Sequence, residues 1–416
     1  MLGNLDAYQD FLTQGADEGV QIMVFPEYGI ASPTFGVEEL PYYTEIIPDP
    51  LVNPCEEWGP KEQEERPITF RLSCMAKKHH LVMVVNMGDK QIGQDGEVNY
   101  YNTQLAYDEN GMLLAKYHKM HLYFEPFSTP KNETPQFFKT SFGVTFGMGI
   151  CFDILFHEPL IDLVDGGITD FVYSTWWVNM PPVLYAPEMQ LGWSTATQSN
   201  LLASGSGMNW ASSGSGIYSA GNILQSFYNN DYKPISKLLV ADVPMLKRRT
   251  RDRRTGDVNI INNVTKWAPI TTTPGYQGAV TLSIQDLKCT FSYGISPNNT
   301  STQSYVLAAI SGYYPERGWI FPMIACLVFP CLNPSDCFAA PYEPTSGTLL
   351  FDKYTLLSSY TPTLNITVYP LQISSNSQIS NSWTFQQPSP NRYTIQLLPQ
   401  HSPQLLLNTG LLGVNE

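Results

Sequence analysis

Three reactive side chains of different types each follow a run of residues that is typical of a strand. Glu27 ends the segment IMVFPE, Lys119 lies in KYHKMHLYFEP, and Cys151 follows FGVTFGMGI. In open α/β sheets, residues at the carboxyl ends of strands line the ligand crevice. A charge directly after a buried strand must be paired or face a site, because burying it alone is costly. The pattern therefore predicts a site that contains a carboxylate, an ammonium and a thiol.

These three groups together could transfer an acyl group through a thioester. A thiol is mostly protonated at neutral pH and needs a base, and Glu27 could take its proton. The thiolate of Cys151 would then attack an amide carbonyl. Lys119 and the backbone N–H of Phe152 could stabilise the negative charge that develops on the carbonyl oxygen. Water would complete the cycle, so the predicted chemistry is the hydrolysis of an amide, without a metal or a cofactor.

Each residue taken singly also has a structural interpretation. Cys151 could be a small buried hydrophobe, Glu27 a cap at a strand end, and Lys119 a surface cation beside Lys116. The joint context of the three motifs favours the catalytic interpretation.

Nearby histidines offer a rival scheme. His118, His121 and His157 flank Lys119 and Cys151, and a cysteine protease would need one of them within hydrogen-bond reach of the sulfur. His157 could equally be a satisfied core histidine. The clustered cysteines lack a nearby histidine, so no zinc site is expected.

The same motifs resemble those of a known family. FPE at Glu27, KYHKMHLYFEP at Lys119 and GICFDILFHEP at Cys151 are similar to the Glu-Lys-Cys motifs of the nitrilase superfamily of carbon–nitrogen hydrolases, in its vanin and biotinidase branch. IPDPLVNPC, RLSCMAKKHH, STWW and CLVFPCLNPSDC extend the resemblance over nearly the whole chain. It implies a four-layer α-β-β-α nitrilase-like sandwich followed by a smaller β-rich domain.

The resemblance also implies an activity. It indicates an amidohydrolase that cleaves a linear secondary amide, first of all pantetheine to pantothenate and cysteamine, with biotin amides as the close alternative. A non-catalytic glycosylated binding protein that keeps the fold is the alternative from another functional class. The partner expected for the enzyme is a small-molecule amide, and the oligomeric state stays open.

Residue roles follow from the same resemblance. Glu27 would be the base, Lys119 the oxyanion stabiliser and Cys151 the nucleophile. A second glutamate would orient water, and Glu125 in LYFEP is preferred over Glu133. Pocket candidates are Trp176 and Trp177 of STWW.

The cysteines fit this resemblance as well. Cys55 and Cys74 match two cysteines that pair in the branch. The four cysteines of the second half, Cys289, Cys326, Cys331 and Cys337, would form two more bridges. Cys151 would then be the odd thiol among the seven cysteines.

Alternating helices and apolar strands must position the three groups. Helical periodicity over 2–16 precedes a strand at 21–27, and helices at 72–80 and 158–167 lead into strands at 81–89 and 168–175. The segment 98–119 predicts a hairpin, because Glu109-Asn110-Gly111 supplies turn residues. We expect an α/β domain over residues 1–245.

The second half of the chain shows short strand patterns and little helical periodicity. Short strand candidates at 278–284, 305–311, 365–371 and 392–398 are separated by Ser, Pro and Asn clusters. We expect a β-rich domain over 276–416 and a basic linker over 246–275.

The formal net charge of −14 disfavours binding to nucleic acid or to anionic membrane surfaces. Six of the 23 basic residues lie within 247–254, so the rest of the chain is more acidic than the total. This basic run is interpreted as a solvated loop, with proteolytic processing or contact with an acidic partner as alternatives.

Sequons begin at Asn132, Asn263, Asn298, Asn299 and Asn365. Together with the cysteines, they favour a secreted or lumenal protein. The apolar stretch 319–331 is too short to span a bilayer. No signal peptide is visible in the first residues, and the resemblance places a core strand before the helix at residue 2. We therefore expect that the chain is truncated at its N-terminus.

Overall fold

The computed structural model describes most of the chain. The described residues are 1–31, 36–93, 96–180, 184–247, 264–313, 322–333, 335–338, 347–360, 367–374, 379–389, 391–401 and 404–414.

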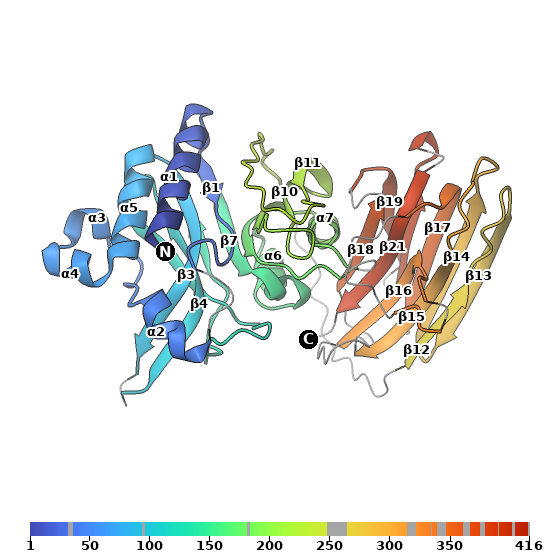
Figure 1. Ribbon diagram of the computed structural model, residues 1–416, viewed down its shortest axis with the longest axis horizontal. Helices are drawn as coiled ribbons and strands as arrows, with labels where there is room; N and C mark the ends of the chain where they lie inside the picture. The colour runs from blue at the N-terminus through green and yellow to red at the C-terminus, as the bar shows by residue number, and fades with distance from the viewer. Residues whose placement is uncertain are drawn as a thin grey trace.

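The first sheet carries two helices on its outer face. Its strands follow the order β1-β3-β4-β5, and β2 pairs with β3. Figure 1 shows α1 (Leu2–Asp17) and α5 (Pro67–His79) beside this sheet. The strands are β1 (Ile22–Val24), β2 (Thr44–Glu45), β3 (Val82–Ile92), β4 (Val98–Tyr107) and β5 (Leu113–His118), with the short helices α2 (Leu40–Tyr43), α3 (Pro54–Glu57) and α4 (Pro60–Glu65).

Strand β3 is buried on both of its faces. Met83 and Val85 pack with the core under α1 and α5, whereas Val82 and Val84 join the core between the two sheets. Successive side chains of a strand point to opposite faces, so a continuous apolar run suits a strand covered on both sides. This burial explains why residues 81–85, LVMVV, form an unbroken hydrophobic run.

A second sheet lies against the first. It has the order β11-β10-β9-β8-β7-β6, and β7, β8 and β9 are parallel to one another. Its strands are β6 (Phe137–Lys139), β7 (Thr145–Ile150), β8 (Asp170–Thr175), β9 (Asn200–Gly205), β10 (Ser215–Ser219) and β11 (Asn222–Phe227), with the helices α6 (Leu160–Asp165) and α7 (Ala186–Thr197). The predicted α-β-β-α arrangement of the first domain is confirmed.

The C-terminal domain is a ten-stranded β structure. Its main path runs β12-β15-β16-β21-β17-β14-β13, with β18, β19 and β20 attached to it. The strands are β12 (Val264–Pro269), β13 (Gln277–Ile284), β14 (Leu287–Ile295), β15 (Tyr305–Tyr313), β16 (Pro322–Pro330), β17 (Leu350–Tyr360), β18 (Thr367–Ser374), β19 (Trp383–Ser389), β20 (Arg392–Leu397) and β21 (Gln404–Val414). The prediction of a β-rich second domain is confirmed.

Most predicted elements of the first domain are present. The helix expected over 2–16 is α1, and the strands expected over 81–89 and 168–175 are β3 and β8. The predicted hairpin is β4 and β5, and Gly111 adopts the positive φ of 89° that its turn requires. Helix α7 was not predicted from the sequence.

The boundary of the second domain differs in one detail from the sequence expectation. Part of the predicted linker forms β12, whose Trp267 pairs with Ala308 of β15. Of the basic run at 247–254, residues 248–254 lie outside the described residues.

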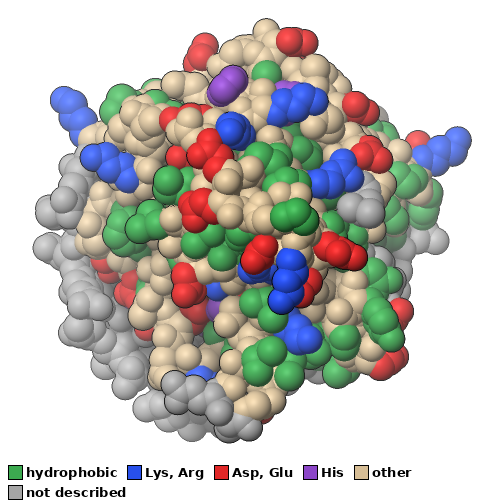
Figure 2. Space-filling model, turned by 90° about the vertical axis from the view of Figure 1, so that its left-hand side faces the viewer, with side chains coloured by type: hydrophobic (Ala, Val, Ile, Leu, Met, Phe, Trp, Pro, Cys, Tyr) green, Lys and Arg blue, Asp and Glu red, His purple; other side chains and the backbone are tan. Residues whose placement is uncertain are grey.

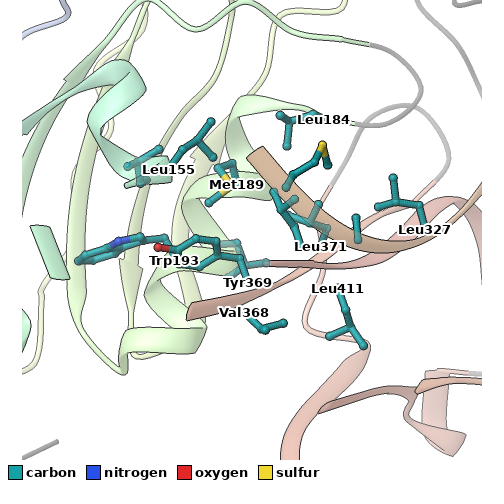
Figure 3. Close-up of a cluster of buried hydrophobic side chains, with 14 of the residues drawn as sticks. Leu155, Leu184, Met189, Trp193, Leu327, Val368, Tyr369, Leu371 and Leu411 are labelled. Carbon is teal, nitrogen blue, oxygen red and sulfur yellow. The ribbon is translucent and has the colours of Figure 1, made fainter. Parts of the chain in front are cut away.

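Helix α7 of the first domain packs directly against β18 of the C-terminal domain. In Figure 3, Met189 and Trp193 of α7 face Tyr369 and Leu371 of β18, and Leu155 lies in the same buried cluster. Leu155 ends the short helical turn that begins at Cys151. The second domain therefore supports the layer that carries the predicted nucleophile.

Three disulfides are present. They join Cys55 to Cys74, Cys289 to Cys326, and Cys331 to Cys337, and Cys151 is a free buried thiol. The prediction of three bridges and one odd thiol is confirmed. Several disulfides are typical of proteins that fold outside the reducing cytosol.

Among the described residues, none of the helices has both the length and the apolar character needed to cross a membrane. Figure 2 shows the face at the left of Figure 1, where acidic and basic side chains are interspersed instead of forming one patch of a single sign.

Candidate active site

Cys151 lies at a sharp turn directly after β7. Its φ is 45°, in the left-handed region that residues other than glycine seldom adopt. The Tyr173 hydroxyl donates to the Cys151 carbonyl over 2.6 Å, and Asp153 accepts from the Ile150 N–H over 3.0 Å. Such strain persists only where neighbouring contacts fix the backbone, and it is common at functional sites.

Lys119 follows β5 and is only 2% exposed. Its backbone N–H donates to the Asn102 carbonyl over 2.8 Å. Its ammonium lies 2.8 Å from Glu27 Oε1 and forms a second ion pair with Glu125. Because β1 and β5 both run parallel to β3, their carboxyl ends meet at one edge of the sheet, which brings Glu27 and Lys119 together.

Glu27 is 1% exposed and has donors on both oxygens. Oε1 accepts from Lys119 Nζ and from Asn102 Nδ2, each over 2.8 Å. Oε2 accepts from the Trp176 backbone N–H over 2.7 Å. The carboxylate therefore has a fixed position at the junction of the two sheets.

Glu125 completes a buried charge cluster. It accepts from the Tyr28 hydroxyl over 2.5 Å and from Asn102 Nδ2 over 2.6 Å, in addition to pairing with Lys119. The competing glutamate of the sequence analysis, Glu133, pairs instead with His118. Among the contacts of the described residues, Lys119 pairs with Glu125 and not with Glu133.

Sequence reasoning missed three residues that orient this cluster, Asn86, Asn102 and Tyr28. Asn102 bridges Glu27 and Glu125, and Asn86 Nδ2 donates to Asn102 Oδ1 over 2.6 Å. Tyr28 was missed although it directly follows the FPE motif. The available signal was the presence of amide side chains within the strands β3 and β4, since buried polar groups require partners.

The charges of the cluster determine its protonation. Burial raises the pKa of the Glu27 carboxyl, Lys119 opposes this rise, and Glu125 adds to it. Burial alone would lower the pKa of Lys119, but Glu125 and Glu27 hold it well above its ordinary value. Lys119 is therefore a permanent cation in the working pH range.

The thiol is less acidic than an ordinary cysteine in the free protein. Burial raises the pKa of Cys151, the Glu27 carboxylate adds to the rise, and Lys119 opposes it. Glu125 has the opposite shift: burial would raise its pKa, but Lys119 holds it below the ordinary value. The resting site thus contains a neutral thiol, a cation and an ionised Glu125.

Two of the remaining predicted residues contact neighbours of this cluster through their rings. Phe152 follows Cys151, and its ring packs 5.3 Å from that of Tyr123. The ring of Trp176 makes an edge contact with Tyr28 at 6.3 Å, whereas Trp177 is 4% exposed.

The histidines have other partners. His121 lies 3.2 Å from Asp153 Oδ1, and His157 lies 3.3 Å from Asp162. These pairings favour structural roles over a cysteine–histidine pair. Within the described part of the chain, no group of three or more His, Cys, Asp or Glu side chains is placed to hold a metal ion.

Comparison with known proteins decides the family. The carbon-nitrogen hydrolase model matches residues 2–193, and the model of the vanin C-terminal domain matches residues 261–416. Human pantetheinase is 32% identical over 362 residues, which cover 79% of this chain and 68% of that protein. The chain belongs to the pantetheinase and biotinidase family of carbon–nitrogen hydrolases. The predicted family and enzyme class are confirmed.

Two further relatives match mainly the hydrolase domain. Bovine pantetheinase is 37% identical over 254 residues, or 58% of this chain and 49% of its own length. Mouse biotinidase is 37% identical over 258 residues, or 58% of this chain and 48% of its own length. This pantetheinase-family chain thus spans about half the length of each of these two relatives in the matched region.

Proposed function

We propose that this protein hydrolyses a linear secondary amide with Cys151 as nucleophile, Glu27 as general base and acid, and Lys119 as oxyanion stabiliser. The observation that carries the proposal is the buried Lys119 ammonium, which bridges Glu27 and Glu125 and acts electrostatically on the one free thiol among the seven cysteines.

In the first half of the reaction, Cys151 Sγ attacks the amide carbonyl carbon and transfers its proton to Glu27. Burial raises the pKa of both groups, so proton transfer accompanies the attack instead of preceding it. Lys119 Nζ and the Phe152 N–H stabilise the oxyanion. Glu27 then protonates the leaving amine, and a thioester remains on Cys151.

In the second half, water attacks the thioester. Glu27, again unprotonated, takes a proton from that water, and the acid product leaves as the thiolate regains its proton. Glu125 pairs with Lys119 directly and is linked to Glu27 through Asn102, so it helps to fix the positions of both. We assign Glu125 the role of the second glutamate, which orients the attacking water.

We propose that the acyl group of the substrate is pantothenoyl. Relatives named pantetheinase include both the human and the bovine proteins, and pantetheine is therefore the first substrate to test. Hydrolysis would release cysteamine and pantothenate. Biotin amides are the second candidate, because mouse biotinidase is as similar as bovine pantetheinase over the hydrolase domain. We place Trp176 and Trp177 in the substrate pocket.

The location follows from the disulfides. Three bridges favour an extracellular or surface protein, and we propose that it is secreted.

The test is incubation of the purified protein with pantetheine and with biocytin, while amine release is followed by mass spectrometry. The expected result is release of cysteamine, of lysine, or of both, and its absence in the Cys151→Ser variant. Release of neither amine by the wild-type protein, or equal release by Cys151→Ser, would contradict the proposal.

A further inference from the structure

A second group of charges lies one residue before Lys119. His118 Nε2 is 2.9 Å from Asp89 Oδ2, and His118 Nδ1 is 3.1 Å from Glu133 Oε2. The Asp89 side chain is fully buried, and the side chains of His118 and Glu133 are each 14% exposed. The imidazole is therefore held between two carboxylates.

The neighbouring elements surround this imidazole. Lys116 of β5 lies 3.4 Å from Asp89 and 3.7 Å from Asp49. Gln91 and the Ile47 N–H also donate to Asp89, over 2.7 and 3.0 Å. The ring of Tyr101 from β4 stacks on His118 at 4.4 Å. Asp89 thus has several donors, whereas Glu133 is held by His118.

The geometry defines a protonation state. A neutral imidazole donates from one nitrogen only, so it cannot donate to carboxylates at both ends, whereas an imidazolium can. Burial would lower the pKa of His118, but its bonds to Asp89 and Glu133 outweigh this effect and raise it. The charged form is therefore the one that fits both contacts.

Glu133 lies in the same loop as Glu125, near the end of that loop. This loop, residues 119–136, leaves the first sheet after β5 and enters the second sheet at β6. Ser128 ties its middle to β4, because its N–H donates to the Tyr100 carbonyl over 2.7 Å. The His118–Glu133 pair ties the far part of the loop to the strand that leads into Lys119.

We propose that His118 is a positioning residue: an ionic staple that holds the Glu125 loop against the sheet through Glu133 and releases it at alkaline pH. This inference rests on the proposed function, because it concerns how Glu125 is kept beside Lys119. His118 acts through the loop and does not touch the reacting atoms.

The sign of the pH effect follows from the contacts. Below its raised pKa, His118 is charged and binds both carboxylates. Above that pKa it keeps one N–H, and Asp89 is the stronger partner because it is fully buried. The Glu133 contact is then lost, the loop loosens, and turnover falls at alkaline pH.

The test compares pH profiles of kcat and KM for the wild-type protein, Glu133→Gln and the control Glu64→Gln. Glu64 is exposed on α4, which lies at the outer end of the first domain (Figure 1). Removing the Glu133 charge lowers the pKa of His118, so the alkaline limb of kcat should move to lower pH. The acidic plateau should stay near that of the wild type, because the amide oxygen of the substituted side chain can accept from the imidazolium. KM should change little, and Glu64→Gln should match the wild type.

Hydrogen exchange gives a readout that does not require activity. After correction for intrinsic rates, amides of residues 120–136 should lose protection in the wild type as pH rises through the alkaline limb, and at a lower pH in Glu133→Gln, while α7 stays protected. If neither amide is hydrolysed but this exchange shift occurs, the proposed function fails and the staple stands. An alkaline limb and an exchange profile that do not move in Glu133→Gln would overturn the staple.

Discussion

At the scale of single residues, the site depends on a cation that is buried together with two carboxylates. Lys119 is 2% exposed and Glu27 is 1% exposed, so neither charge is solvated, and each needs the other. The two carboxylates raise the pKa of Lys119 and keep it charged. Burial and Glu125 raise the pKa of Glu27 against the effect of Lys119, which makes Glu27 easier to protonate during turnover. Most of the catalytic effect is therefore expected from fixed electrostatics.

Removal of the Lys119 ammonium should nearly abolish turnover. We expect Lys119→Ala to lower kcat by about 100- to 1000-fold, because loss of one oxyanion donor costs roughly 3 to 4 kcal/mol. Lys139→Ala, at an exposed lysine of β6, should retain activity. Thermal unfolding of both variants separates a folding defect from loss of catalysis. A folded Lys119→Ala protein with wild-type kcat would contradict the assigned role.

Glu125 should influence the acid limb of the pH profile through its effect on the pKa of Glu27. Because the Glu27 pKa is raised, its base form is lost as pH falls through a value above that of an ordinary glutamate. The charge of Glu125 contributes to this rise, so Glu125→Gln should lower the Glu27 pKa and shift the acid limb of kcat/KM to lower pH, along with a lower maximum. A shift to higher pH would contradict the coupling of the two carboxyls.

Sequence and structure agree unevenly at this scale. Glu27, Lys119 and Cys151 were chosen as candidates because each lies in a distinctive motif at a strand end, and the structure pairs Lys119 with Glu27. Asn102 was not found, because its role depends on contacts with residues 75 and 23 positions away. An amide within a buried strand indicates that a polar partner is needed, but it does not indicate which distant residues supply that partner.

At the scale of elements, the turn from β7 into the helical segment Cys151–Leu155 presents the thiol. Tyr173 of the neighbouring strand β8 bonds the Cys151 carbonyl and helps hold the positive φ. The sheet therefore helps to support the proposed nucleophile Cys151, and the pairing of β7 with β8 sets its position.

Loss of the Tyr173 hydroxyl should loosen this turn. Tyr173→Phe leaves a buried carbonyl without its donor, which costs about 1 to 3 kcal/mol of unfolding free energy. We expect lower stability in chemical denaturation and a lower kcat. Tyr232→Phe, at an exposed tyrosine (67%), is the control and should change neither. A Tyr173→Phe protein that is unchanged in both would rule out the supporting role.

Strands such as β3 and β8 were predicted because their apolar runs are bounded by turn residues, whereas β9, β14, β16, β17 and β21 were not predicted. Helix α7 was missed because it has little amphipathic pattern: residues Ala186–Ser194 are all buried, between the second sheet and β18. Helices are recognised from sequence by a polar face, and a helix buried on all sides in its first turns lacks one.

At the scale of the whole molecule, the two domains share one hydrophobic core. The cluster that contains Cys151 and Leu155 continues through Met189 and Trp193 into Leu371 of the C-terminal domain (Figure 3). Domain interfaces of this apolar kind do not favour independent motion of the parts. The vanin-type domain is therefore expected to stabilise the hydrolase domain.

A test of this coupling uses Gly192, which lies where α7 meets β18. A Cβ at this position would clash with the Pro370 carbonyl oxygen, a backbone atom. We expect Gly192→Ala to lower the unfolding free energy by about 1 to 3 kcal/mol. Gly3→Ala, in α1, meets no atom within 4 Å and is the matched helical control. It should be neutral or stabilising, because alanine favours a helix. Equal melting temperatures for Gly192→Ala and the wild type would contradict a tight interface.

The proposed hydrolysis passes through a thioester on Cys151, and acid-quench mass spectrometry can detect this intermediate. The protein is mixed with excess pantetheine, quenched in acid at short times, and digested. We expect the peptide that contains Cys151 to carry the pantothenoyl group transiently, and the Cys151→Ser variant never to carry it as a thioester. Release of cysteamine and pantothenate without any acylated peptide, together with turnover by Cys151→Ser, would contradict it.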